Sequence, residues 1–307
     1  MPSLVYGPVP SRRLGRSLGV DIVPYKICSF DCIYCQIGRT TEHQPERKAY
    51  VTAAEVVPQV EDRLKTCARP DFITLGGSGE PTLNTELEDI IAGIKSITGV
   101  PVALLTNGSM MADPEIRRAC CNADVIIPDL DAGDEETFRI INRPCESISF
   151  EDVVAGLIAL REEFNGQIWL EVFFAAGIND SPQQAKKIAD IAEKIKPEKI
   201  HINTVARPAA EADVSAVPRE RLEELREILG PKAEIVADFS KHEAKSTGTV
   251  SRESVLDMLK RRPCTIADVA DGLNADQWEV ASHVKSLVMK GDAEEAVVGD
   301  KVYFKAK

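Results

Sequence analysis

Three cysteines lie within eight residues of one another near the N-terminus. Cys28, Cys32 and Cys35 have the spacing C-x3-C-x2-C and directly follow the first apolar run that suggests a strand. Three thiolates on one short loop can each bind one iron atom of a cubane cluster, which leaves the fourth iron without a protein ligand. An open coordination position is typical of a catalytic metal site. The alternative is a zinc knuckle, but zinc knuckles usually combine two short Cys or His arms, and this sequence has no second arm. The spacing therefore predicts a 4Fe–4S cluster.

The remaining five cysteines form no second set with ligand spacing. They are scattered at Cys67, Cys120, Cys121, Cys145 and Cys264. Eight cysteines in a chain without an export signal are not expected to form a disulfide framework. We expect Cys120 and Cys121 to pack in the interior, and neither Cys145 nor Cys264 to bind iron.

The cysteine loop, with Tyr34 directly before Cys35, resembles the signature of the radical S-adenosylmethionine (SAM) superfamily. The resemblance implies that the open iron is chelated by the amino and carboxylate groups of SAM. It also implies that the reduced cluster cleaves SAM to methionine and a 5′-deoxyadenosyl radical, which abstracts a hydrogen atom from a substrate. A reductant such as flavodoxin or ferredoxin would then be a partner.

A glycine-rich segment follows the second expected strand. Its sequence, Gly-Gly-Ser-Gly-Glu-Pro-Thr, is similar to the GGE element of the family, with Ser78 in place of the first glycine. Glycine lets the backbone approach a ligand closely. The resemblance implies that Ser78, Gly79 and Glu80 contact SAM and that Glu80 binds its ammonium group. If the resemblance is set aside, the alternative interpretation is an ordinary βα turn with an acid near a helix N-terminus.

Polar residues also follow the third and fourth expected strands. Thr106 and Asn107 begin a Thr-Asn-Gly turn that is similar to the family's turn beside SAM, although such a sequence alone is an ordinary turn. After the next strand, either Asp129 or Asp131 could accept hydrogen bonds from the ribose hydroxyls of SAM. Solvated acids at a helix entry are the alternative for this pair.

The fifth and sixth expected strands carry the last candidate residues. Glu171 opens a segment that resembles the one backing the adenine of SAM, and Asn203 and Arg207 are candidate contacts to SAM or substrate. His201 lies on an apolar strand, where a core residue with satisfied hydrogen bonds is the simpler interpretation.

Apolar runs alternate with amphipathic stretches from about residue 17 to residue 236. This alternation predicts an α/β fold with right-handed βαβ units and a parallel sheet. About six units are too few for a closed eight-stranded barrel, so an open or partial barrel fits, and the resemblance implies a partial (β/α)6 barrel over residues 1–236. Active sites of such sheets lie at the carboxyl ends of the strands. The expected strands are 18–23, 72–75, 102–106, 125–128, 169–174 and 200–204, and the expected helices are 53–65, 86–97, 114–121, 135–141, 150–163, 183–195 and 219–229.

The C-terminal part of the chain has a different pattern. Residues 237–249 lose the periodicity and are interpreted as a linker. Helices are expected at 251–261, 265–272 and 276–290, and strands at 295–298 and 301–304 flank a Gly-Asp hairpin turn. This order is that of a small winged helix–turn–helix domain at 250–307. The presumed recognition helix opens with Asp276 and Glu279, which would repel phosphates in a major groove. We therefore expect this domain to dock a protein or peptide, or to close over the barrel.

Charge and composition limit the partners. The chain has 307 residues, is 44% hydrophobic and carries a net charge of −12, which argues against a broad nucleic-acid-coating surface. Arg12, Arg13 and Arg16 form a local basic strip that is either a solvated loop or an anion-binding site. The N-terminus has neither a basic n-region nor an apolar h-region and no apolar run is long enough to cross a membrane, so we expect a cytoplasmic protein with no membrane contact.

A narrower resemblance covers residues 5 to about 236. The segments 6–15, 32–36, 131–133 and 142–144 are similar to a group of stand-alone Fe–S oxidoreductases related to the wybutosine-synthesis enzymes, which rebuild a guanine in tRNA. This implies radical modification of a tRNA base or nucleoside. The basic or flavodoxin-like extensions expected for that role are missing. The alternative is radical modification of a peptide or small anionic metabolite, with the winged helix as a partner-recognition module. A non-catalytic Fe–S or DNA-binding regulator is disfavoured because it would lack the SAM motifs.

Overall fold

The computed structural model describes residues 3–236, 250–273, 275–299 and 301–307. Its centre is a mostly parallel eight-stranded sheet with the order β1-β2-β5-β6-β7-β8-β9-β10. Only β1 (Val5–Ser11) is antiparallel to its neighbour, β2 (Gly15–Val20). The other strands are β5 (Phe72–Leu75), β6 (Val102–Thr106), β7 (Val125–Pro128), β8 (Gln167–Phe174), β9 (Lys199–Thr204) and β10 (Ala233–Ile235). Each parallel strand is placed beside the one before it in the chain.

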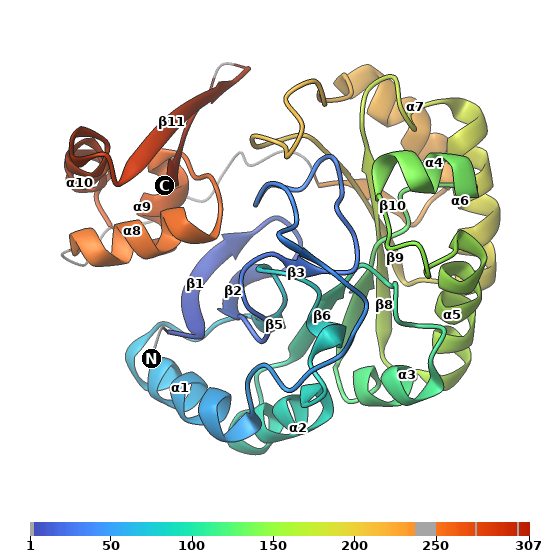
Figure 1. The fold of residues 1–307 in the computed structure, drawn as a ribbon, viewed down its shortest axis with the longest axis horizontal. Coiled ribbons are helices and arrows are strands. Elements are labelled where there is room, and N and C mark those ends of the chain that lie inside the picture. Colours follow the sequence, from blue (N-terminus) through green and yellow to red (C-terminus); the bar gives the residue numbers. More distant parts are fainter. Residues whose placement is uncertain (1–2, 237–249, 274, 300) are drawn as a thin grey trace.

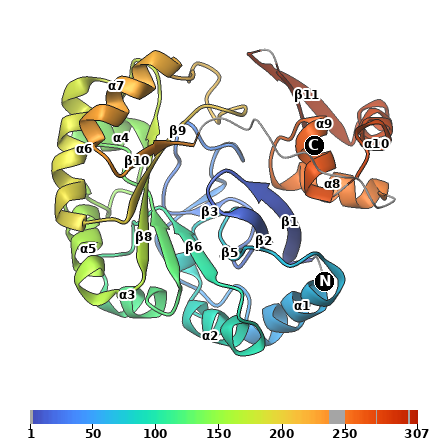
Figure 2. The same cartoon turned by 180° about the vertical axis from the view of Figure 1, so that it is seen from behind.

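Helices cover the outer side of the curved sheet (Figure 1), as the view from behind also shows (Figure 2). They are α1 (Ala53–Thr66), α2 (Leu87–Ile97), α3 (Pro114–Cys120), α4 (Glu135–Ile141), α5 (Phe150–Glu163), α6 (Pro182–Ile195) and α7 (Arg219–Leu229), with a short 3-10 turn, η1, at Pro81–Leu83. On β8, Ile168 and Leu170 join the large core with the helices, while Trp169 packs with Leu14 and Ala103 inside the curve. Because both faces of the sheet are buried, its central strands β5, β6 and β7 are almost continuously apolar.

Two of the expected helices, α3 and α6, begin with a side-chain cap. Asp113 accepts a hydrogen bond from the N–H of Glu115 and caps α3, and Ser181 accepts one from the N–H of Gln184 and caps α6. Both helices have proline in the first turn, where a missing N–H costs nothing. Asn84, in contrast, is not the cap of α2. Its side-chain amide donates to the carbonyls of Ile22 and Val51 and so joins the loops around η1.

Two strands of the central sheet were not expected from the sequence. β1 contains Gly7, Pro8 and Pro10, which weaken a strand pattern. Proline is tolerated on an edge strand because a residue whose N–H would face away from the sheet does not have to donate a hydrogen bond to a neighbouring strand. β10 extends the parallel part of the sheet beyond β9. Two short strands, β3 (Ile27–Cys28) and β4 (Glu42–His43), pair with each other on either side of the cysteine loop.

Residues 250–307, named here the C-terminal module, pack around a core of their own. The module contains α8 (Arg252–Arg261), α9 (Ile266–Leu273), α10 (Gln277–Lys290), β11 (Ala293–Val298) and β12 (Lys301–Ala306), of which β11 and β12 form an antiparallel hairpin. α9 lies against β1, and Val9 of β1 is buried in the module's core. The Arg261 side chain stacks on Tyr6 and forms an ion pair with Asp21. The expected linker, 237–249, lies outside the described residues.

Within the described part of the chain, no helix combines the length and apolar character that a membrane span requires.

Candidate functional site

The three cysteines of the loop line one pocket of about 170 Å³. All three are free thiols. The pocket lies at the carboxyl ends of the central strands, since Glu80 follows β5 and Asp129 follows β7, and both line it with Tyr34, Thr106 and Asn107. Among the described residues, the three cysteines included, no group of three His, Cys, Asp or Glu side chains is arranged to hold a single metal ion. In a cubane cluster each thiolate binds a different iron atom.

Side-chain amides point at two of the cysteine sulfurs. Nδ2 of Asn107 donates to Sγ of Cys28 at 3.5 Å, and Nδ2 of Asn142 donates to Sγ of Cys32 at 3.6 Å. Burial raises the pKa of all three thiols. Bound iron would displace their protons, because the metal ligand is the thiolate. Three convergent thiols with N–H donors to sulfur fit an iron–sulfur cluster, whose properties depend on such hydrogen bonds.

Glu80 joins the glycine-rich segment to the Thr-Asn-Gly turn. Its Oε1 accepts hydrogen bonds from the backbone N–H and the hydroxyl of Thr82 and from the hydroxyl of Thr106, at 3.1, 2.5 and 2.7 Å. Its Oε2 accepts from the N–H of Asn107 at 2.7 Å. Burial raises the pKa of this carboxyl group and the four hydrogen bonds oppose that shift. Glu80 therefore holds the glycine-rich segment against the Thr-Asn-Gly turn, besides lining the pocket.

The two aspartates after β7 have different surroundings. Asp131 accepts hydrogen bonds from the hydroxyl of Tyr34, from Nδ2 of Asn142 at 2.7 Å and from the N–H of Phe173 at 2.8 Å. The Tyr34 ring stacks on Phe173 with the centroids 3.9 Å apart. Asp131 is thus occupied in positioning the cysteine loop, whereas Asp129 lines the pocket. Of the two candidates for the ribose hydroxyls, the geometry favours Asp129.

The glycine-rich segment lies tightly against the cysteine loop. A Cβ atom on Gly79 would lie 2.1 Å from the carbonyl oxygen of Ile27, so only glycine fits there. Gly79 lines the pocket, but Ser78 does not; Ser78 lines a neighbouring, larger cavity instead. Ser78 therefore lies outside the pocket that holds the cysteines.

Glu171, Asn203 and Arg207 are not among the residues that line the cysteine pocket. Glu171 and Asn203 belong to a polar network with Arg12 and Arg13. Arg13 forms an ion pair with Glu171, and Nη1 of Arg12 donates to Oδ1 of Asn203 at 2.6 Å. Asn203 in turn donates to Glu171 at 3.0 Å.

Arg207 connects the cysteine loop with the C-terminal module. Its Nη1 donates to Oε1 of Gln36, the residue after Cys35, at 3.5 Å, and its Nη2 lies 3.7 Å from Asp268 of α9. Burial, with nearby arginines as a further cause, lowers the pKa of Arg12 and Arg207 to about 9. The surroundings therefore disfavour these charges, which is a pattern found at functional sites.

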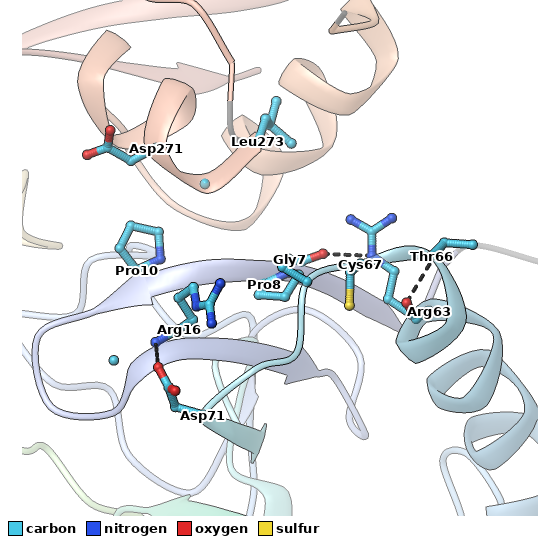
Figure 3. A pocket seen from close by; sticks show the side chains of 13 residues that line it. Gly7, Pro8, Pro10, Arg16, Arg63, Thr66, Cys67, Asp71, Asp271 and Leu273 are labelled. Atoms are coloured by element: carbon cyan, nitrogen blue, oxygen red, sulfur yellow. Dashed lines mark hydrogen bonds between the residues drawn. The ribbon is translucent and has the colours of Figure 1, made fainter. Parts of the chain in front are cut away.

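Arg16, the third cation of the basic strip, lies at the end of the sheet that is opposite to the cysteine pocket. Its backbone N–H donates to Asp71 at 2.7 Å. Both residues line a cavity of about 620 Å³ between α9 and the β1–α1 edge, which Figure 3 shows together with Arg63 and Cys67. This cavity lies at the amino ends of β2 and β5, away from the cysteine loop. The strip is therefore divided between two sites.

His201 is a core residue, as expected, but its hydrogen bonds are only half satisfied. Its Nε2 interacts with Oε1 of Glu234 at 2.9 Å and its ring contacts Trp169 edge-on, whereas its buried Nδ1 has no hydrogen-bond partner in the described part of the chain. The residue that sequence reasoning missed is Asn142, which bonds both Cys32 and Asp131. The only signal for it was the Asn-Arg-Pro segment, which suggested a family but no role.

The family model of the radical SAM superfamily matches residues 22–192, more than half of the chain. The chain therefore belongs to the radical SAM superfamily. Members of this superfamily are enzymes, and the family alone leaves the reaction open.

Two curated relatives and one solved structure define the similarity more closely. The chain is 37% identical over 297 residues to a protein named GTPase Obg from Brachyspira hyodysenteriae, covering 96% of this chain and 44% of that protein. It is 33% identical over 211 residues to UPF0026 protein MJ1312 from Methanocaldococcus jannaschii, covering 68% of this chain and 65% of the relative. A radical SAM methyltransferase from Sphaerobacter thermophilus matches with a TM-score of 0.52 and 19% identity over 71% of this chain and 66% of that one.

The chain spans less than two thirds of the length of each of these two curated relatives. The name of the first describes a GTPase, but the present sequence contains no G-x-x-x-x-G-K-S/T phosphate loop. The structural similarity concerns the fold alone.

Proposed function

We propose that this chain is a radical SAM enzyme whose cluster is held by Cys28, Cys32 and Cys35. The observation that carries the proposal is their convergence on one pocket with Glu80, Asn107 and Asp129. When bound there, a 4Fe–4S cluster and SAM would supply a 5′-deoxyadenosyl radical for hydrogen abstraction. The sheet would act as a partial (β/α)6 barrel, and the C-terminal module as a winged helix.

The side chains have separate roles in this proposal. Asn107 and Asn142 orient the Cys28 and Cys32 sulfurs and donate hydrogen bonds to them. Glu80 and the backbone around Gly79 would bind the amino group of SAM, and Asp129 would accept hydrogen bonds from the ribose hydroxyls. Radical SAM enzymes need an external reductant, for which flavodoxin or ferredoxin is proposed.

The surroundings of the site favour a small anionic substrate over tRNA. Arg12 and Arg13 reach Asn203 and Glu171 inside the curve of the sheet, where guanidinium groups could bind a phosphate or carboxylate. The net charge of −12 opposes binding of a long polyanion. The first helical turn of α10 carries acids as well, since Asp276 caps it and Glu279 lies within it.

The test is release of 5′-deoxyadenosine by the anaerobic, cluster-loaded protein with SAM and reduced flavodoxin. We expect a small-molecule extract to stimulate release severalfold and unmodified tRNA to have no effect. Cys32→Ala is the control for cluster-dependent release. Stimulation by tRNA but not by the extract would reverse the choice of substrate class, and no release under any condition would refute the proposed reaction.

A further inference from the structure

A second cavity lies between the C-terminal module and the sheet, beside the cysteine pocket. It has a volume of about 1150 Å³, close to the upper range of small-molecule sites. One wall consists of residues after β2 and β5, such as Asp21 and Ser78, and the other of residues on α8, β11 and β12. Lys26 lines both this cavity and the cysteine pocket. A ligand in the cavity would therefore lie next to the site described above.

The walls of the cavity are rich in cations. Five of them line it, and two are already paired with carboxylates: Arg261 with Asp21, and Lys260 with Asp257 at 3.3 Å. Lys26, in the turn before β3, and Lys305 of β12 form no ion pair with a carboxylate in the described residues. These two lysines come from parts of the chain that meet only when the module lies against the sheet.

The ammonium groups of Lys26 and Lys305 converge on one spot. They lie 2.8 and 3.7 Å from the position that a Cβ atom on Gly38 would occupy, so the two nitrogens are no more than about 6.5 Å apart. Two ammonium groups at this distance repel each other, and an anion that contacts both would offset this repulsion.

The backbone holds Lys26 in place. Its φ of 64° lies in the left-handed region, which a lysine rarely adopts. Its N–H donates to the carbonyl of Ser78 at 2.6 Å, and its carbonyl accepts from the N–H of Thr41 and of Glu42. A strained backbone fixed on both sides indicates that the position of this side chain is specified.

We propose that Lys26 and Lys305 bind a phosphate group of a small molecule that occupies this cavity. Lysine binds phosphate as a point charge, and charge-assisted hydrogen bonds form at about 2.8 Å, so one phosphate can bridge two ammonium groups at this separation. A phosphate monoester carries a charge of about −1.5 to −2 and three acceptor oxygens, which matches two cations better than a singly charged carboxylate. The ligand would also join the module to the sheet. This binding does not depend on the proposed SAM chemistry.

The test is calorimetric titration of the full chain with inorganic pyrophosphate at constant ionic strength, without SAM. We expect saturable binding that Lys305→Gln weakens at least tenfold and that Lys305→Arg retains within about threefold. Lys285→Gln is the matched control, because Lys285 is an exposed lysine on α10 and loses the same charge. Acetate should bind at least tenfold more weakly than pyrophosphate.

Three outcomes would overturn the proposal. They are no saturable binding of pyrophosphate, equal binding by the Lys305→Gln variant and the unchanged protein, and equal affinity for acetate and pyrophosphate. The cluster absorbance of each variant is recorded alongside, so that a variant that fails to fold is recognised. Since 5′-deoxyadenosine release is not measured, failure here leaves the proposed reaction untouched.

Discussion

Replacing Glu80 by glutamine should destabilise the protein even when no SAM is present. The carboxylate accepts three hydrogen bonds at Oε1 and one, from the N–H of Asn107, at Oε2. A glutamine can present its carbonyl oxygen to Thr82 and Thr106, but its NH2 group then faces the N–H of Asn107. A buried donor left without an acceptor costs about 1–3 kcal/mol. Because burial raises the pKa of Glu80, removing the charge recovers part of the desolvation cost. We expect a net loss of about 1–2 kcal/mol in the free energy of unfolding.

Urea unfolding followed by the fluorescence of the buried Trp169 measures this loss, since the other tryptophan, Trp278, is 85% exposed. The midpoint should fall with an unchanged slope. Glu88→Gln is the matched control, because Glu88 is exposed on α2 and undergoes the same chemical change. If Glu80 served only to bind SAM, Glu80→Gln and Glu88→Gln would both leave the stability within about 0.5 kcal/mol of the unchanged protein, and the structural role assigned here would be refuted.

Three further outcomes are expected. Cys32→Ala should abolish the visible charge-transfer absorbance of the reconstituted cluster while Cys67→Ala retains it; full iron content in the first variant would contradict the cluster assignment. Asn142→Ala removes a donor to a cysteine sulfur, so the midpoint potential of the cluster should become more negative in an EPR-monitored titration, and an unchanged potential would argue against that contact. Burial lowers the pKa of His201 to about 4, so between pH 6.5 and 4 this imidazole is protonated in the unfolded state but stays neutral in the folded state. Stability should therefore fall by up to about 3 kcal/mol across this window, and His201→Gln should lack that part of the pH dependence in urea unfolding at pH 7 and 4.5.

The strands were predictable because each buried strand is a short apolar run, and the limits of β5, β6 and β7 agree with the pattern. The first parallel strand was expected at 18–23 but spans Gly15–Val20. It was placed too late because Ile22 and Val23 are buried and apolar although they lie in the loop beyond its end. β1 was not predicted because its glycine and prolines interrupt the strand pattern. An edge strand tolerates these residues.

The site was predictable where the ligands are close in sequence, and much less so where they are distant. The three cysteines share one loop, so their spacing alone carries the chemistry. Asn142 lies 110 positions from Cys32, and nothing local marks its amide as a donor to sulfur. The basic strip could not be divided by sequence either, since Arg13 and Arg16 are only three positions apart but lie in different sites. Such placements depend on the turn between β1 and β2, which only the fold specifies.

The carboxylates of the motifs are of two kinds: those that accept hydrogen bonds from the protein itself, and one that lines the pocket. This difference affects how a loss of activity on mutation should be interpreted. Asp131 accepts three hydrogen bonds and Glu80 four, all from the protein itself. Loss of activity on replacing either residue would therefore report misplacement of the cysteine loop or of the Thr-Asn-Gly turn as much as loss of a ligand contact. Asp129 lines the pocket, and no hydrogen bond or ion pair among the described residues ties its side chain to these loops. Asp129→Asn should consequently weaken SAM binding while leaving the unfolding free energy without SAM close to that of the unchanged protein. Equilibrium binding of SAM and urea unfolding of the same variant separate the two effects. A loss of stability as large as that of Glu80→Gln would show that Asp129 is a structural acceptor as well.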